Sequence, residues 1–111
     1  MRLLVCGGRD CHMPETMFEA LRLLRPSVVI HGGARGADIS ADVCALAFGI
    51  DVEVYPADWA KHGKAAGPIR NAQMLREGRP DAVLAFPGGR GTADMVRQAK
   101  RAGVPVWEVR P

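Results

Sequence analysis

The stretch that decides the fold is Val28-Val29-Ile30-His31-Gly32-Gly33-Ala34-Arg35-Gly36-Ala37-Asp38. Its first three residues are apolar and β-branched, which is typical of a short strand that is buried on both faces. A glycine pair ends the strand, and a helical pattern begins directly afterwards. A strand that leads through a glycine turn into a helix is the repeating unit of a parallel α/β domain.

The helix in this unit is predicted to run from Ala37 to Phe48, with Gly49 as its C-terminal stop. Ile39, Val43 and Leu46 recur at helical spacing along it. A helix normally covers a sheet with one such apolar stripe. We therefore expect these three side chains to be buried against the sheet.

The same alternation of strand and helix continues along the whole chain. Strands are predicted at residues 3–6, 28–30, 52–55, 82–86 and 104–109, and helices at 14–24, 37–48, 68–77 and 92–102. Right-handed crossovers between successive strands give a parallel sheet. The expected strand order is 3-2-1-4-5, with the topological switch between the first and fourth strands. The prediction is a single three-layer, Rossmann-like α/β domain that occupies residues 1–111.

Composition narrows the class of protein. The 111 residues carry a formal net charge of +3, and the basic residues are scattered, which suits an anionic small molecule better than nucleic acid. No apolar run approaches the roughly 18 residues that span a bilayer and no signal peptide is visible, so we expect no membrane partner and a cytoplasmic location. Cys6, Cys11 and Cys44 form no paired motif, so we predict neither a disulfide framework nor a metal site, and no cofactor.

Three predicted strands end in a glycine pair, namely Gly7-Gly8, Gly32-Gly33 and Gly88-Gly89. In the expected order these strands are neighbours, so their turns meet on one rim, where open α/β sheets bind ligands. Glycine lets a phosphate approach the backbone amides, and the next helix offers unpaired N–H groups and the positive end of its dipole. Neither Gly32–Asp38 nor Pro87–Thr92 is a P-loop or a G-x-G-x-x-G motif. The prediction is a phosphate-binding cleft unlike that of the ordinary dehydrogenases.

Basic, amide and aromatic side chains accompany these turns. The polar segment 58–67 is placed to fold over the cleft as a wall or lid, which brings Arg70 and Asn71 near a phosphate and Trp59 near a base. Arginines beside the glycine turns suit phosphate because a guanidinium binds it in a two-pronged way. The complete set of predicted ligand-binding residues is Gly7, Gly8, Arg9, Gly32, Gly33, Arg35, Gly36, Asp38, Trp59, Arg70, Asn71, Pro87, Gly88, Gly89, Arg90, Gly91 and Thr92.

Two acidic residues, Asp38 and Asp94, fall in the first turn of a predicted helix. The helix dipole favours an acid there by about 0.3–1 kcal/mol, with no need for a functional role. Alternatively, one of them contacts the sugar hydroxyls of a ligand or acts as a general acid or base. The residues alone leave both interpretations open.

Four motifs, taken in order, resemble the SLOG superfamily, and specifically its short stand-alone YspA-type branch, which is related to YpsA. They are Gly32–Asp38, Pro56–Trp59, Gly67–Met74 and Ala85–Thr92, and the resemblance covers essentially the whole chain. The superfamily includes the Lonely Guy cytokinin-activating enzymes and the DNA-processing protein DprA. The resemblance implies a Rossmann-like fold that binds nucleotides or nucleotide-derived ligands.

The Lonely Guy enzymes cleave the bond between a base and ribose 5′-monophosphate. Their signature is P-G-G-x-G-T-x-x-E, with an arginine on the preceding helix. This chain matches the signature from Pro87 to Thr92, and Arg70 resembles the arginine, but Met95 stands where the glutamate is expected. If an activity of this type is present, the resemblance makes Arg70 and Asp94 the catalytic candidates.

The sequence therefore predicts a domain that binds a nucleoside phosphate or an ADP-ribose-like ligand, as a sensor or processing domain. One alternative is a nucleoside 5′-monophosphate phosphoribohydrolase. Another is a DprA-like module associated with single-stranded DNA, although no basic surface with interleaved aromatic residues is visible. Because a small domain gains stability from association and the superfamily commonly forms dimers, we also expect a homo-oligomer.

Overall fold

Five parallel strands form one sheet in the order β3-β2-β1-β4-β5, which confirms the predicted order. The computed structural model describes residues 1–111. Its elements are β1 (Arg2–Cys6), α1 (Pro14–Leu24), β2 (Val28–His31), α2 (Ala37–Phe48), β3 (Asp51–Val54), α3 (Trp59–His62), the 3-10 helix η1 (Gly63–Ala65), α4 (Ala66–Gly78), β4 (Ala82–Ala85), α5 (Arg90–Arg101) and β5 (Val106–Glu108).

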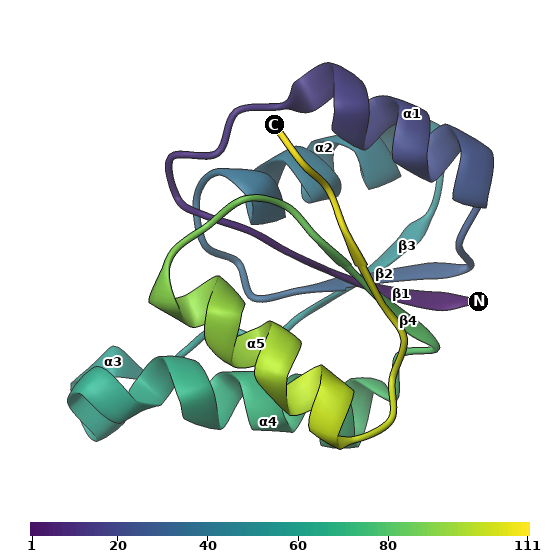
Figure 1. Ribbon diagram of the computed structural model, residues 1–111. Coiled ribbons are helices and arrows are strands. Elements are labelled where there is room, and N and C mark those ends of the chain that lie inside the picture. Colours follow the sequence, from purple (N-terminus) through teal and green to yellow (C-terminus); the bar gives the residue numbers. More distant parts are fainter.

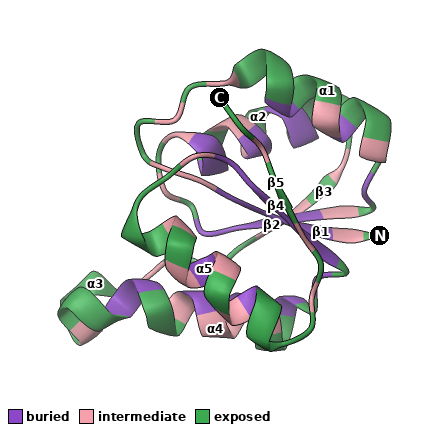
Figure 2. Cartoon of the chain, viewed as in Figure 1, coloured by how far each residue is buried: buried purple, intermediate pink, exposed green.

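Helices cover both faces of the sheet and make it the middle of three layers. Helices α1 and α2 lie on one face and α4 and α5 on the other (Figure 1). Leu3 and Val5 of β1 join the core under α1 and α2, whereas Leu4 and Cys6 join the core under α4 and α5. Figure 2 shows the buried residues concentrated on the strands and on the inward sides of the helices. This division explains why the strand sequences are apolar throughout rather than alternating.

Helix α2 lies where the sequence predicts it, but the prediction of its buried face is wrong. Ile39, Val43 and Leu46 are 46%, 61% and 79% exposed. The residues that face the sheet are the small ones, Ala37, Ala41, Cys44 and Ala45 together with Asp38. Small side chains let the helix axis approach the sheet closely, so the bulky apolar residues are left on the outer side.

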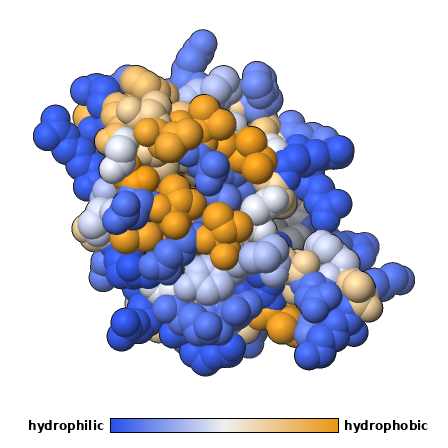
Figure 3. All heavy atoms as spheres, turned by 180° about the vertical axis from the view of Figure 1, so that it is seen from behind, coloured by the Kyte–Doolittle hydropathy of each residue, from blue (hydrophilic) through white to orange (hydrophobic).

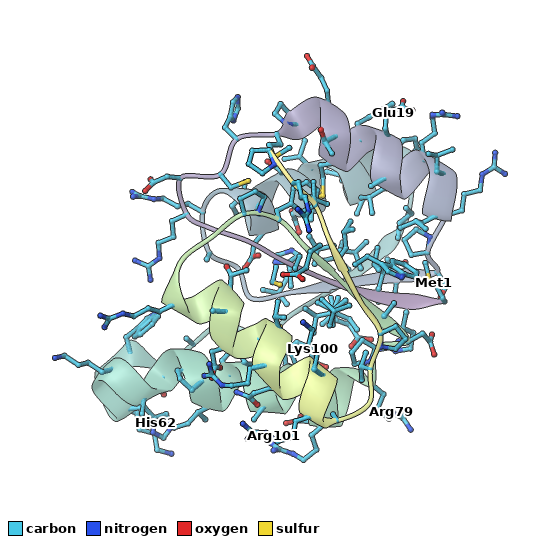
Figure 4. The ribbon with its side chains drawn as sticks, in the orientation of Figure 1. Met1, Glu19, His62, Arg79, Lys100 and Arg101 are labelled. Atoms are coloured by element: carbon cyan, nitrogen blue, oxygen red, sulfur yellow. The ribbon has the colours of Figure 1, made fainter.

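The segment predicted as a polar wall or lid is largely helical. Asp58 caps α3 by accepting a hydrogen bond from the Lys61 N–H at 3.1 Å. Helix α4 then begins at Ala66, two residues before the expected start at Pro68. Figure 4 shows His62 on the outer side of this layer. The segment thus forms a continuous helical wall beside the carboxyl ends of the strands.

None of these helices is both long enough and apolar enough to cross a bilayer.

Candidate ligand-binding cleft

A cleft of about 1040 Å³ opens at the carboxyl ends of the central strands. Register places the ends of β1, β2 and β4 side by side, because Leu4 pairs with both Ile30 and Val83. The three glycine turns and the wall formed by α3 and α4 surround the cleft. Its lining includes all of the predicted ligand-binding residues except Gly36. The volume is at the upper end of the range for small-molecule sites, roughly 300–1,000 Å³.

The three glycine turns are packed against one another by backbone contacts. The Gly8 N–H donates to the Pro87 carbonyl at 2.9 Å, and the Ala37 N–H donates to the Gly8 carbonyl at 3.3 Å. A Cβ on Gly88 would lie 2.6 Å from the Gly8 nitrogen, and a Cβ on Gly36 would collide with the Gly8 carbonyl oxygen. Gly36 also has a φ of +81°, which disfavours any other residue. These two glycines are therefore required by the packing of the turns.

Several amides of the turn before α2 are hydrogen-bonded within the protein itself. The Asp38 carboxyl group accepts hydrogen bonds from the Gly32 and Ala34 N–H groups at 3.1 and 3.2 Å. The Gly33 N–H donates to Nδ1 of His31 at 3.0 Å. Burial raises the pKa of Asp38, and the Ala34 N–H, His31, Arg70 and the Gly32 N–H oppose that rise. This turn therefore presents a carboxyl group to the cleft, beside amides that the carboxyl group already engages.

Neither α2 nor α5 has a side-chain cap, but the turn before α5 differs in lacking an acid. No side chain caps α5, and no acidic residue lies in its first turn. The N–H groups of Arg90, Gly91 and Thr92 have no hydrogen-bond partner within the chain. A Cβ on Gly89 or Gly91 would meet no atom within 4 Å. Helix α5 therefore presents open donors and the positive end of its dipole to the cleft.

Two comparisons with known proteins identify the family of the chain. A family model described as the YspA, cpYpsA-related SLOG family matches residues 1–62. The Gene 61 protein of Mycobacterium phage D29 is 44% identical over 117 residues, which covers 95% of this chain and 93% of that protein. The chain belongs to this SLOG family. The part matched by the family model runs from β1 through α3 and contains two of the three glycine turns.

Arg70 of this SLOG domain joins the helical wall to the turn after β2. Its guanidinium donates through Nη1 to the Gly32 carbonyl at 2.8 Å and through Nε to Oδ1 of Asn71 at 3.1 Å. Burial lowers the pKa of Arg70, partly offset by nearby Asp38, although an arginine still stays protonated. No partner engages Nη2, and the residue lines the cleft. Arg70 is therefore a fixed cation with one nitrogen free for an anion.

Asp94, the other catalytic candidate, does not line the cleft. Its carboxylate accepts from Nδ2 of Asn71 at 3.0 Å, from Arg97 at 2.8 Å and from Gln98 at 2.8 Å. The contact with Asn71 joins α5 to α4, whereas Arg97 and Gln98 belong to α5 itself. Met95, which replaces the glutamate of the Lonely Guy signature, is buried and lies in the floor of the SLOG cleft. No carboxylate of α5 reaches the cleft.

The aromatic and remaining basic side chains stand at the cleft mouth. Trp59 is half exposed, and the Arg9 guanidinium lies 5.6 Å from the centre of its ring. Arg35 is directed to the rim, where it pairs with Asp10 at 3.3 Å. Trp59 is thus accessible at the cleft mouth, with Arg9 of the β1 turn over its ring.

Sequence reasoning missed the floor of the cleft. Cys6 lies there, where burial raises the pKa of its thiol to about 12, so it is a neutral wall rather than a nucleophile. Met74 also contributes, from α4. His31 was missed too: its Nδ1 holds the Gly33 N–H while its Nε2 lies 2.9 Å from Asp42. The signal available in the sequence was the position of Cys6 and His31 as the last residues before two glycine pairs.

Proposed function

We propose that this SLOG domain binds a phosphate-bearing nucleotide or nucleotide-derived ligand, of the nucleoside phosphate or ADP-ribose-like class. The observation that carries the proposal is the uncapped N-terminus of α5, whose free N–H groups open onto the cleft. A phosphate there accepts hydrogen bonds from Arg90, Gly91 and Thr92 and gains from the helix dipole. Arg70 adds a cation from the facing wall.

The rest of the cleft fits the other parts of such a ligand. The Asp38 carboxyl group lines the cleft and is suited to accept hydrogen bonds from ribose hydroxyls. Trp59 is half exposed at the cleft mouth, and we infer that a base stacks there beside Arg9. Phosphate at α5 and sugar toward α2 give the ligand one orientation, because the two helix N-termini differ in what they present.

We infer a sensor or carrier rather than a hydrolase as the favoured form of this function. The Lonely Guy signature ends in a carboxylate, and this chain has buried Met95 there instead. The neighbouring Asp94 is engaged with Asn71, Arg97 and Gln98, which leaves it no place at the reacting bond.

The test is a thermal-shift screen against AMP, ADP, ATP, NAD, ADP-ribose and ribose 5-phosphate, followed by analysis of each hit for released base. At a ligand concentration of about 100 Kd, binding stabilises the fold by about 2.7 kcal/mol, which raises Tm by at least about 10 °C. A shift with intact ligand supports the proposal. Release of free base would instead establish the phosphoribohydrolase alternative, and no shift with any compound would contradict nucleotide binding.

A further inference from the structure

Three arginines of the cleft have no acidic partner. Four arginines and two aspartates line the cleft, but only Arg35 among these arginines forms an ion pair, with Asp10 at the rim. None of the other ion pairs of the chain involves Arg9, Arg70 or Arg90. Uncompensated cations that line one cleft raise its affinity for an anion with more than one negative charge.

Arg70 is held at the end of β2. Its Nη1 donates to the Gly32 carbonyl at 2.8 Å and more weakly to the Tyr55 carbonyl at 3.4 Å, and its Nε donates to the Asn71 side chain at 3.1 Å. A Cβ on Gly32 would collide with the guanidinium, so the close approach requires glycine there. All three acceptors are neutral. The charge of Arg70 is therefore fixed in place without being neutralised.

Arg9 is a second cation close to Arg70. Its guanidinium lies 5.6 Å from the centre of the Trp59 ring, and a Cβ on Gly67 of α4 would lie 3.6 Å from the same ring. Arg70 follows Gly67 by three residues, so it projects from the same side of α4. Burial lowers the pKa of Arg70, nearby Asp38 opposes this, and the positive charge of Arg9 adds to it. The two guanidinium groups are therefore near enough to repel each other.

The sheet order places Arg9 midway along the rim of the cleft. The turn after β1, which carries Arg9, lies between the turns after β2 and β4. A Cβ on Gly36 would lie 2.6 Å from the Arg9 carbonyl oxygen, so this turn is also packed against the start of α2. Neighbouring strands are about 4.8 Å apart, so the turns after β2 and β4 stand roughly 10 Å apart. A phosphate at α5 and a sugar at Asp38 leave room between them, beside Arg9 and Arg70.

The wall that carries Arg70 has a polar outer surface. Figure 3 shows hydrophilic side chains over most of the lower part of the molecule, where α3 and α4 lie in Figure 1, and hydrophobic side chains gathered above them. Lys61 and Lys64 are exposed on this wall. An anionic ligand with a long apolar chain would find little apolar surface here, whereas a ligand with a second phosphate fits the charge of the wall.

We propose that Arg9 and Arg70 form a second phosphate subsite, so that the ligand of this cleft carries a pyrophosphate group rather than a single phosphate. The inference rests on the proposed function and narrows the class of its ligand. One phosphate accepts from the α5 amides beside Arg90, the next lies between Arg9 and the free Nη2 of Arg70, and the ribose reaches Asp38. A guanidinium binds a phosphate through parallel hydrogen bonds, and that of Arg9 is engaged only with the Trp59 ring.

The experiment compares the Kd values of AMP, ADP and ADP-ribose for the full chain by calorimetric titration at one ionic strength. ADP and ADP-ribose are expected to bind at least tenfold more tightly than AMP. ADP-ribose separates the pyrophosphate from charge alone, because near neutral pH it carries almost the same net charge as AMP. The variant Arg9→Gln is expected to remove most of the preference for ADP and ADP-ribose while leaving the Kd of AMP nearly unchanged. Arg9→Lys keeps the charge and is expected to retain part of the preference.

Arg101→Gln controls for the loss of one positive charge. Arg101 is exposed, ends α5 away from the cleft and does not line it (Figure 4), so this variant is expected to keep the preference. A circular dichroism melt establishes that each variant folds. Equal Kd values for the three compounds, a parallel loss of AMP and ADP in Arg9→Gln, or the same loss of preference in Arg101→Gln would each overturn the second subsite and leave the proposed function standing. Binding of none of the three compounds would overturn both.

Discussion

Replacing Gly91 by alanine is expected to stabilise the protein while weakening the proposed ligand. Gly91 lies in the first turn of α5, its φ is not positive, and an added Cβ would meet no atom within 4 Å. Folding therefore makes no demand for glycine at this position. Alanine restricts the unfolded chain and favours the helix, which at a first-turn position is worth about 0.5 kcal/mol, or about 2–4 °C in Tm.

The effect on binding has the opposite sign. A helical Cβ tilts toward the helix N-terminus, where a phosphate oxygen has to lie about 2.9 Å from the free amides. We expect the Kd of the best nucleotide hit to rise at least tenfold, which corresponds to about 1.4 kcal/mol. Calorimetric titration gives the Kd, and thermal melts of the free protein give the stability. Unchanged affinity in Gly91→Ala would refute the placement of phosphate at α5, and a lowered Tm would refute the claim of open space.

Gly88→Ala is the matched control in the same turn. Its Cβ would stand 2.6 Å from the Gly8 nitrogen and 2.9 Å from Cβ of Thr92. Backbone atoms cannot move aside cheaply, so this variant is expected to lose about 1–3 kcal/mol of stability, as overpacked sites do. Substitution of Gly88 thus tests what folding requires of this turn, and substitution of Gly91 tests what ligand binding requires.

Three other variants test the remaining parts of the cleft. Trp59→Ala should weaken AMP but not ribose 5-phosphate in calorimetric titration, because only AMP carries a base; equal losses would remove the stacking role. Asp94→Asn should lower the free energy of unfolding by about 1–2 kcal/mol, since it weakens the pair with Arg97, and should leave ligand affinity unchanged; a specific loss of affinity would return Asp94 to the site. Burial raises the pKa of Asp38 above its ordinary 3.8, so the folded protein favours the protonated carboxyl group. The resulting contribution to the free energy of unfolding is complete below pH 3.8 and is lost as the pH rises through the raised pKa. Urea unfolding should therefore show the wild type losing stability relative to Asp38→Asn between pH 4 and pH 7, and parallel pH profiles would contradict this.

Strand positions and sheet order were predictable because a parallel sheet that is covered on both faces requires strands that are apolar at nearly every position. Short β-branched apolar runs such as Val28–Ile30, followed by a glycine or proline turn, are typical of buried strands. The orientation of α2 was not predictable in the same way. Its residues are apolar on both sides, so periodicity identifies a helix without saying which side faces the sheet. Size decides the matter in the folded chain, where Ala41 and Ala45 allow a close approach that Val43 and Leu46 would prevent.

The cleft was predictable in outline, because glycine pairs after neighbouring strands must meet at one rim. The separate tasks of the glycines were not. Gly36 and Gly88 are required by loops that approach from distant parts of the chain, whereas Gly89 and Gly91 face open space. Such a distinction depends on distances across the sheet, which local sequence does not encode. The same holds for Asp94, whose partner Asn71 comes from another helix.

The difference between the two helix N-termini gives the cleft its direction. Both α2 and α5 follow a glycine turn, and both point the positive end of their dipole toward the same space. At α2 the chain supplies its own acid, since Asp38 takes the Gly32 and Ala34 amides, and a second anion there would have to displace it. At α5 the first turn holds no acid, so an anion that stabilised this end would have to come from outside the chain. A ligand that carries phosphate at one end and hydroxyl groups at the other satisfies both ends at once, whereas a free phosphate satisfies only α5. Ribose 5-phosphate should therefore bind more tightly than inorganic phosphate, and this preference should disappear in Asp38→Asn.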